Sequence, residues 1–162
     1  MIALPNECFL KIFSNFSNDG DYKSLFSCLF VNRHWCRIII PILWRQPTVH
    51  FDDRRLIRMY LLELNSEEQA SIVPFKIILP VDPKPLFEYT SFTTSVGFCL
   101  DDGVKNWLID EGYRTDRFHD SDDDYDEPVN AIICSLIVML LRTSNNLKHL
   151  RFNGSICNKM KH

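Results

Sequence analysis

Large apolar side chains recur at every third or fourth position through residues 4–45, and this period is typical of short amphipathic helices. The first such run places its apolar residues on one stripe: Leu4, Cys8, Phe9, Ile12, Phe13 and Phe16. Pro5 suits the start of a helix, where the N–H that proline lacks would have no partner. The turn residues Asn-Asp-Gly at 18–20 then end the helix.

Two further runs of the same period follow the turn. The second covers residues 22–31, with apolar positions at Leu25, Phe26, Leu29 and Phe30. The third begins near Asn32 and has Trp35, Ile38 and Ile39 on one side. Pro41 is expected to end this helix, so that Ile42, Leu43 and Trp44 form a short apolar segment after it. The pattern predicts three short helices in succession.

These helices carry more large apolar side chains than so small a bundle can bury. About 40 residues enclose little apolar surface on their own. The surplus has two interpretations: docking on the rest of this chain, or an exposed patch that binds another protein.

The middle of the chain, 47–115, is predicted to be mainly helical. Residues 53–64 have the apolar period of a helix, with Arg54, Arg55 and Arg58 off its apolar face. Such arginines can clamp phosphate, but on an amphipathic helix they usually form the solvated side. Prolines around 74–85 favour an isolated strand or an extended connection. Residues 87–107 are expected to form helical pieces broken at Gly97 and Gly103.

The segment 116–127 holds seven acidic residues and a single arginine. Asp120, Asp122 and Asp124 match the first ligand positions of an EF-hand loop, but Tyr125 replaces the glycine and Ala131 the glutamate that the loop requires. A run of like charges is usually a solvated loop. We therefore predict an acidic flexible loop that binds no calcium.

A helix is predicted from Pro128 to about Arg142, followed by a polar turn. The spacing of Leu147, Leu150 and Phe152 is similar to the start of a leucine-rich repeat. The order of helix, turn and strand is also that of the repeat unit. Because such solenoids need about three repeats, residues 128–162 are expected to be a truncated repeat region.

Composition and motifs argue against several classes of function. A net charge of −3 gives no reason to expect a nucleic-acid partner, and the most apolar stretch, 129–141, is too short to cross a bilayer. The six cysteines include no Cys-x-x-Cys pair, so we expect reduced thiols and neither metal nor cofactor. No nucleophile elbow, phosphate loop or histidine pair at metal spacing occurs. The expectation is a non-catalytic protein of the cytoplasm, the nucleus or both, without membrane contact.

The first 46 residues resemble the F-box. The motif's Leu-Pro and acidic residue correspond to Leu4, Pro5 and Glu7, and its Ile-Phe pair to Ile12 and Phe13. A central apolar helix ends near Val31, and the aromatic third helix and final Leu-Trp correspond to Trp35, Leu43 and Trp44. Phe16 stands where leucine is usual and Asn32 where cysteine is frequent. An F-box followed by the start of leucine-rich repeats also resembles the large fungal expansions of this family.

This resemblance implies a substrate receptor of an Skp–cullin–F-box ubiquitin ligase, mainly α-helical in fold. The Skp adaptor would bind at Leu4, Pro5, Phe9, Ile12, Phe13 and Leu25. The F-box core would consist of Trp35, Ile38, Leu43 and Trp44. Through the adaptor the chain would reach a cullin–RING ligase and present an unknown target protein. The alternative is an adaptor-binding regulatory or decoy protein without a ubiquitination target.

Overall fold

The structure is a computed structural model that describes residues 4–18, 20–47, 54–83, 85–97, 100–113 and 127–151. The protein is mainly helical, as the sequence predicts. The predicted acidic loop, except Glu127, and everything after Arg151 lie outside the described residues.

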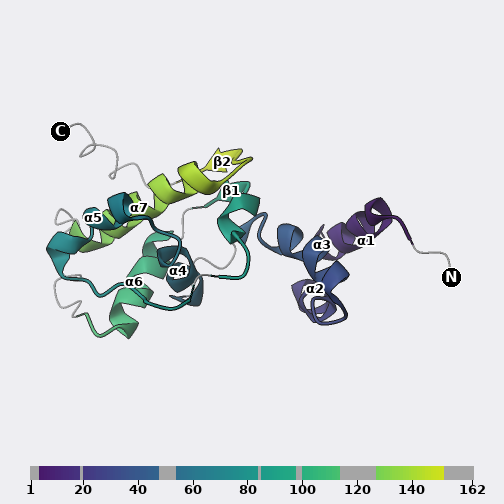
Figure 1. Ribbon diagram of the computed structural model, residues 1–162, viewed down its shortest axis with the longest axis horizontal. Coiled ribbons are helices and arrows are strands. Elements are labelled where there is room, and N and C mark those ends of the chain that lie inside the picture. Colours follow the sequence, from purple (N-terminus) through teal and green to yellow (C-terminus); the bar gives the residue numbers. More distant parts are fainter. Residues whose placement is uncertain are drawn as a thin grey trace.

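The described elements form two groups along the longest axis of the molecule (Figure 1). One end is an N-terminal bundle of three helices: α1 (Asn6–Asn18), α2 (Tyr22–Cys28) and α3 (Arg33–Leu43). These are the three helices that the apolar period predicts. Their core is a cluster of buried side chains: Phe13, Leu25, Ile38, Ile39 and Ile42.

Local polar residues set the ends of these helices. Gly20 has a φ of 74°, a left-handed conformation that suits glycine, and it turns the chain after α1. Asp21 then caps α2 by accepting from the Ser24 N–H at 3.1 Å. Asn32 caps α3 in the same way, accepting from the Trp35 N–H at 2.8 Å. These caps explain why three helices fit into so few residues.

Pro41 does not end the third helix, so that prediction was wrong. α3 continues through Pro41 to Leu43, and the Trp44 N–H still bonds to the Ile40 carbonyl at 3.0 Å. A proline inside a helix costs about 3 kcal/mol. Burial of Ile39 and Ile42 on the two sides of Pro41 offsets this cost, because each buried isoleucine contributes roughly 1.5–3 kcal/mol.

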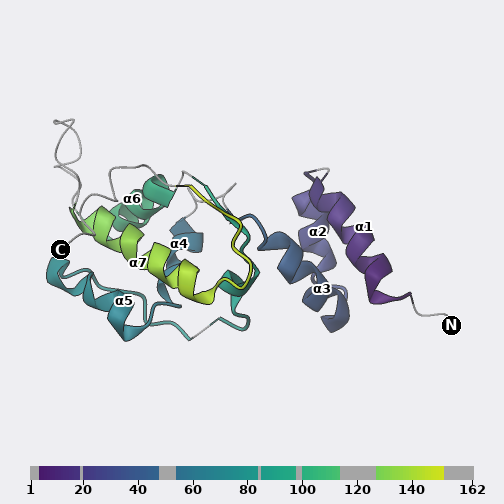
Figure 2. The same ribbon diagram turned by 90° about the horizontal axis from the view of Figure 1, so that it is seen from above.

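The remaining elements form a C-terminal lobe around a second core (Figure 2). In chain order they are α4 (Arg54–Leu61), α5 (Ser66–Ala70), η2 (Val73–Phe75), η3 (Tyr89–Phe92), β1 (Ser95–Val96), α6 (Leu100–Asp110), α7 (Glu127–Thr143) and β2 (His149–Leu150). The most apolar helix, α7, supplies a large share of this core through Ile132, Ile133, Leu136, Met139 and Leu140. Its bounds agree with the predicted helix.

Four details of the lobe differ from the predictions. The short helix α5 was not predicted, because only five residues carry no periodic signal. Gly103 lies buried within α6 and does not break it, since the buried residues around it outweigh a cost of about 1 kcal/mol. Ser95 and Val96 form a strand where helical pieces were expected. The 3-10 helix η2 takes up Pro74 and Phe75 at the start of the proline-rich segment, which was not expected, whereas residues 77–83 have no regular structure and agree with an extended connection.

The strands β1 and β2 form a parallel pair, with Ser95 opposite His149 and Val96 opposite Leu150. The order α7, turn, β2 is the one that suggested a leucine-rich repeat. Phe152 of that pattern lies outside the described residues, and a leucine-rich repeat is not confirmed.

A joint of hydrogen bonds and aromatic rings connects the N-terminal bundle to the C-terminal lobe. The Arg45 carbonyl accepts from both the N–H and the hydroxyl of Thr94, at 2.9 and 3.0 Å. The Thr94 carbonyl in turn accepts from the N–H groups of Lys148 and His149. Trp44 stacks on Tyr89 with ring centroids 4.3 Å apart. We call this connection the Thr94 joint.

Candidate functional site on the N-terminal helices

Two stripes of apolar residues run along α1, and only one of them faces the core. Phe13 is 2% exposed, and Phe9 and Phe16 pack beside it, because 9, 13 and 16 share a face. Ile12 lies on the neighbouring stripe, with Cys8 one turn before it and Leu4 just ahead of the helix. Leu4, Pro5, Cys8 and Ile12 are all exposed. The second stripe is therefore free to contact another protein.

The helix α2 divides its apolar residues in the same way. Leu25 is fully buried, whereas Phe26 and Phe30 are exposed and pack against each other with ring centroids 5.4 Å apart. Phe13 and Leu25 were expected to contact the adaptor, but both are buried in the core of the bundle, where a partner cannot reach them. The predicted contacts that remain accessible are Leu4, Pro5, Ile12 and the half-buried Phe9.

Three of the four predicted core residues lie in or against the core of the bundle. Ile38 is buried, Leu43 packs on the core, and the half-buried Trp35 lies 5.1 Å from the Phe13 ring between centroids. Trp44 does not belong there. It packs against the second core, within 6.1 Å of the Tyr60 ring, because the chain has left the bundle by this residue.

Sequence reasoning assigned no contact role to several exposed apolar residues of the bundle: Leu10, Phe26, Phe30 and Val31. A signal for them was present in the sequence. Leu25 with Leu29 and Phe26 with Phe30 form two i, i+4 pairs across α2 and the turn that follows it, and a segment packed on one side can bury only one of them. Together with Leu4 and Ile12, these four residues are the apolar surface of the bundle.

The arginines of α4 are not simply a solvated face. Arg54 pairs with Asp110, and Arg58 bonds to Asp82 at 2.6 Å and to Glu111 at 3.3 Å. The charges of Arg54 and Arg58 are therefore paired with carboxylates of the C-terminal lobe. Across the described ranges, no cluster of three His, Cys, Asp or Glu residues is placed to hold a metal ion. No helix in the described part of the chain has the length and hydropathy to span a membrane.

Glu63 is a titratable group that bonds to η3, the element that carries the aromatic contact of the Thr94 joint. Its carboxylate accepts from the Thr90 hydroxyl in η3, the element that carries Tyr89 against Trp44. Burial raises the pKa of Glu63 above its ordinary value of 4.5, although the Thr90 hydrogen bond works in the opposite direction. A carboxyl with a raised native pKa contributes its full stability below the unfolded pKa, and that contribution is lost as pH rises through the native pKa.

We expect Glu63→Gln to raise the stability of the protein at about pH 7 but not at about pH 4, because glutamine mimics the neutral acid and keeps an acceptor for Thr90. The measurement is the urea midpoint of both proteins at the two pH values. Glu67→Gln is the matched control, because it makes the same substitution at an exposed position of α5. Equal midpoint changes at both pH values would contradict the prediction.

Comparison with known proteins identifies the bundle. The family model of the F-box-like domain matches residues 1–50, which include α1, α2 and α3. The match over these residues supports the interpretation of the chain as an F-box protein. The domain supports a role in binding an Skp adaptor within Skp–cullin–F-box complexes, and proteins of this family are in general non-catalytic adaptor subunits. No curated protein and no solved structure matches the chain.

Proposed function

We propose that this chain is the substrate-receptor subunit of an Skp–cullin–F-box ubiquitin ligase. The apolar surface of the N-terminal bundle binds the adaptor, and the C-terminal lobe holds a target protein. The ubiquitin is transferred by other subunits, so the chain contributes proximity and not bond chemistry. The ligase would act in the cytoplasm, the nucleus or both.

The observation that carries this proposal is the coincidence of the family match with the apolar surface. The matched residues 1–50 contain Leu4, Ile12, Phe26 and Phe30, each of which is at least 44% exposed. A contiguous exposed apolar patch marks a protein interface, and within this surface the rings of Phe26 and Phe30 pack against each other. The Thr94 joint adds support, because a lobe fixed to the bundle holds its cargo in a defined position.

The double substitution Leu4→Ala with Pro5→Ala is expected to abolish co-purification of the chain with an Skp adaptor. Both side chains are exposed at the start of α1, so their loss should leave the bundle folded. Anchors of an interface typically contribute about 2 kcal/mol or more each, which for two residues exceeds a hundredfold in affinity. The affinity is measured with purified adaptor by calorimetry.

Val81→Ala with Leu86→Ala is the matched control, because both residues are even more exposed but lie in the C-terminal lobe. This control should bind the adaptor as the wild type does. Wild-type affinity in the Leu4 and Pro5 variant would refute the assigned surface. A receptor must also retain a third protein and raise ubiquitin transfer to it, whereas a decoy binds the adaptor alone.

A further inference from the structure

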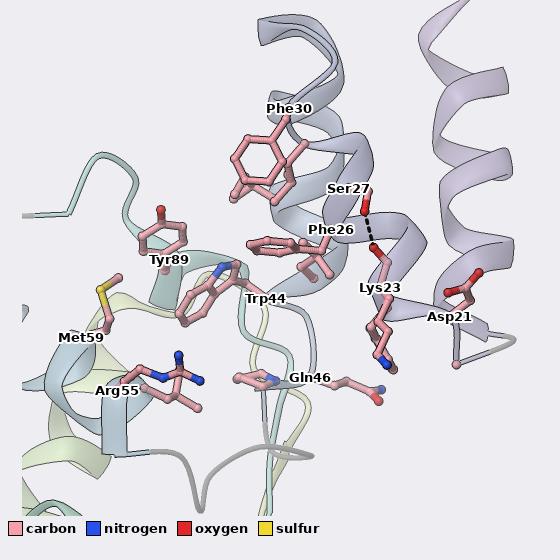
Figure 3. Close-up of a pocket in the computed structure, with 17 residues that line it drawn as sticks. Asp21, Lys23, Phe26, Ser27, Phe30, Trp44, Gln46, Arg55, Met59 and Tyr89 are labelled. Atoms are coloured by element: carbon pink, nitrogen blue, oxygen red, sulfur yellow. Dashed lines mark hydrogen bonds between the residues drawn. The ribbon is translucent and has the colours of Figure 1, made fainter.

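Figure 3 shows a groove at the junction of the N-terminal bundle and the C-terminal lobe, which Phe26 and Phe30 line from the side of α2. Both rings belong to the apolar surface of the bundle, to which the adaptor is proposed to bind. A target protein needs a surface that the bound adaptor leaves accessible. The lobe offers such a surface in the segment between η2 and η3.

This segment carries the most exposed apolar side chain of the described residues. Val81 is 95% exposed, and Ile78 is 78% exposed. Residues 77–83 have no regular secondary structure. Across the described part of the chain, no backbone group of residues 79–83 takes part in a backbone hydrogen bond. We call residues 77–83 the proline strap.

The sequence of the proline strap restricts its backbone to extended conformations. Pro80 and Pro83 each have a φ fixed at about −65° by the ring. The residues before them, Leu79 and Asp82, are confined to the extended or polyproline II region, because the proline ring crowds their backbone. A polyproline II helix has three residues per turn, so that positions three apart share a face.

The contacts of the proline strap follow this period of three. Leu79 packs on the core of the lobe, and three residues later Asp82 accepts from Arg58 Nε at 2.9 Å and from Arg58 Nη2 at 2.6 Å. Ile78 and Val81, which are also three apart, are the exposed pair. One face of the strap therefore lies on the lobe, while another is in contact with solvent.

Two attachments hold the proline strap in this arrangement. One is the bond between Asp82 and Arg58 of α4. The other is the Ile78 N–H, which donates to the Tyr113 hydroxyl after α6. A segment that is already ordered in an extended form loses little conformational freedom when it binds, and this favours affinity.

We propose that the proline strap binds an aromatic-lined groove in a domain of the target protein, of the kind that recognises two prolines three residues apart. Pro83 is exposed and Pro80 is half-exposed, and each fills a pocket between aromatic rings. Val81 packs beside them. This inference rests on the proposed function, since it assigns the domain to the target of the ligase.

The test is retention of the full chain on an array of purified SH3 and WW domains, both alone and with bound Skp adaptor. At least one domain should retain the chain in both forms. Its affinity for the chain is then measured by calorimetry. The affinity should fall by about tenfold or more in the double variant Pro80→Ala with Pro83→Ala, because each proline fills a pocket of its own.

Two controls make the result specific to the proline strap. Pro74→Ala changes an exposed proline of η2 outside the strap and should leave the affinity for the domain unchanged. A synthetic peptide of residues 77–86 should bind the same domain more weakly than the chain does, because the free peptide is not ordered in advance. Circular dichroism checks that each variant keeps its helices.

Four results would overturn the proposal. Retention of the chain by no domain is the first, and full affinity in the Pro80 and Pro83 variant is the second. The third is binding of the peptide without binding of the chain, because the strap would then be inaccessible. The fourth is displacement of the domain by the adaptor. If the wild type binds no adaptor, the proposed function fails, whereas binding of the domain is still measured on the chain alone.

Discussion

Replacing Phe13 by alanine is expected to unfold the N-terminal bundle while the C-terminal lobe keeps its structure. The Phe13 ring is buried, 6.1 Å from the Phe9 ring and 5.1 Å from the Trp35 ring between centroids. Truncating a buried phenylalanine costs about 3–5 kcal/mol. A bundle of this size has little more stability than that to lose. Hydrogen exchange should show lost protection through α1, α2 and α3 and retained protection in α7.

Ile12→Ala is the matched control, since it changes the neighbouring residue on the exposed stripe of α1. Ile12 is 44% exposed, so its truncation should change stability by no more than about 0.5 kcal/mol. Adaptor affinity should nevertheless fall, because Ile12 remains among the predicted contacts. Native protection of the bundle in Phe13→Ala would show that this ring is not essential to the core.

Replacing Arg142 by methionine is expected to destabilise the C-terminal lobe strongly, because it leaves the buried carboxylate of Glu68 without its countercharge. The Glu68 side chain is 2% exposed and accepts from Arg142 Nε at 2.7 Å and from Arg142 Nη2 at 2.9 Å. Breaking a buried pair costs about 3–5 kcal/mol. Since Arg142 itself is half-exposed, the lower end applies. The measurement is the free energy of unfolding in urea.

The pH dependence and two controls separate this charge effect from lost packing. Burial alone would raise the pKa of Glu68, but the bonds from Arg142 and the Asn65 N–H hold it below its ordinary value. That contribution is present above the unfolded pKa and lost as pH falls through the native pKa. The cost of Arg142→Met should therefore shrink in acid.

Adding Glu68→Gln to Arg142→Met should recover part of the loss, because no buried charge then remains. Arg54→Met is the second control. It breaks the pair with Asp110, which is exposed on both sides, and exposed pairs contribute only about 0–1 kcal/mol. Equal losses in Arg54→Met and Arg142→Met would show that burial of Glu68 is not the cause.

The apolar period predicted the longer helices well, because burial of one face decides where such helices form. It could not decide between neighbouring apolar stripes, and so Phe13 and Leu25 were assigned to the surface. The caps at Asp21 and Asn32 fix where α2 and α3 begin, whereas the apolar period alone does not define the first residue of either helix. Periodicity describes one element at a time, whereas burial depends on the partner element.

Contacts between distant segments were beyond reach of the sequence. β1 forms because Ser95 and Val96 pair with His149 and Leu150. A strand of two residues is too short to show the alternation of apolar and polar positions from which strands are predicted. Trp44 was assigned to the bundle because its motif ends there, although its ring packs on Tyr60 and Tyr89 of the next core.

The Thr94 joint also has a consequence for the order in which the protein folds. The contacts of the N-terminal bundle are all close in sequence, and contacts of this kind form rapidly. The joint, in contrast, needs Lys148 and His149, which leave the ribosome long after Arg45. Domains generally fold as units during synthesis, the N-terminal one first. The F-box is thus expected to become competent for its adaptor while the lobe behind it is still being made, so that assembly begins before the C-terminal lobe is complete.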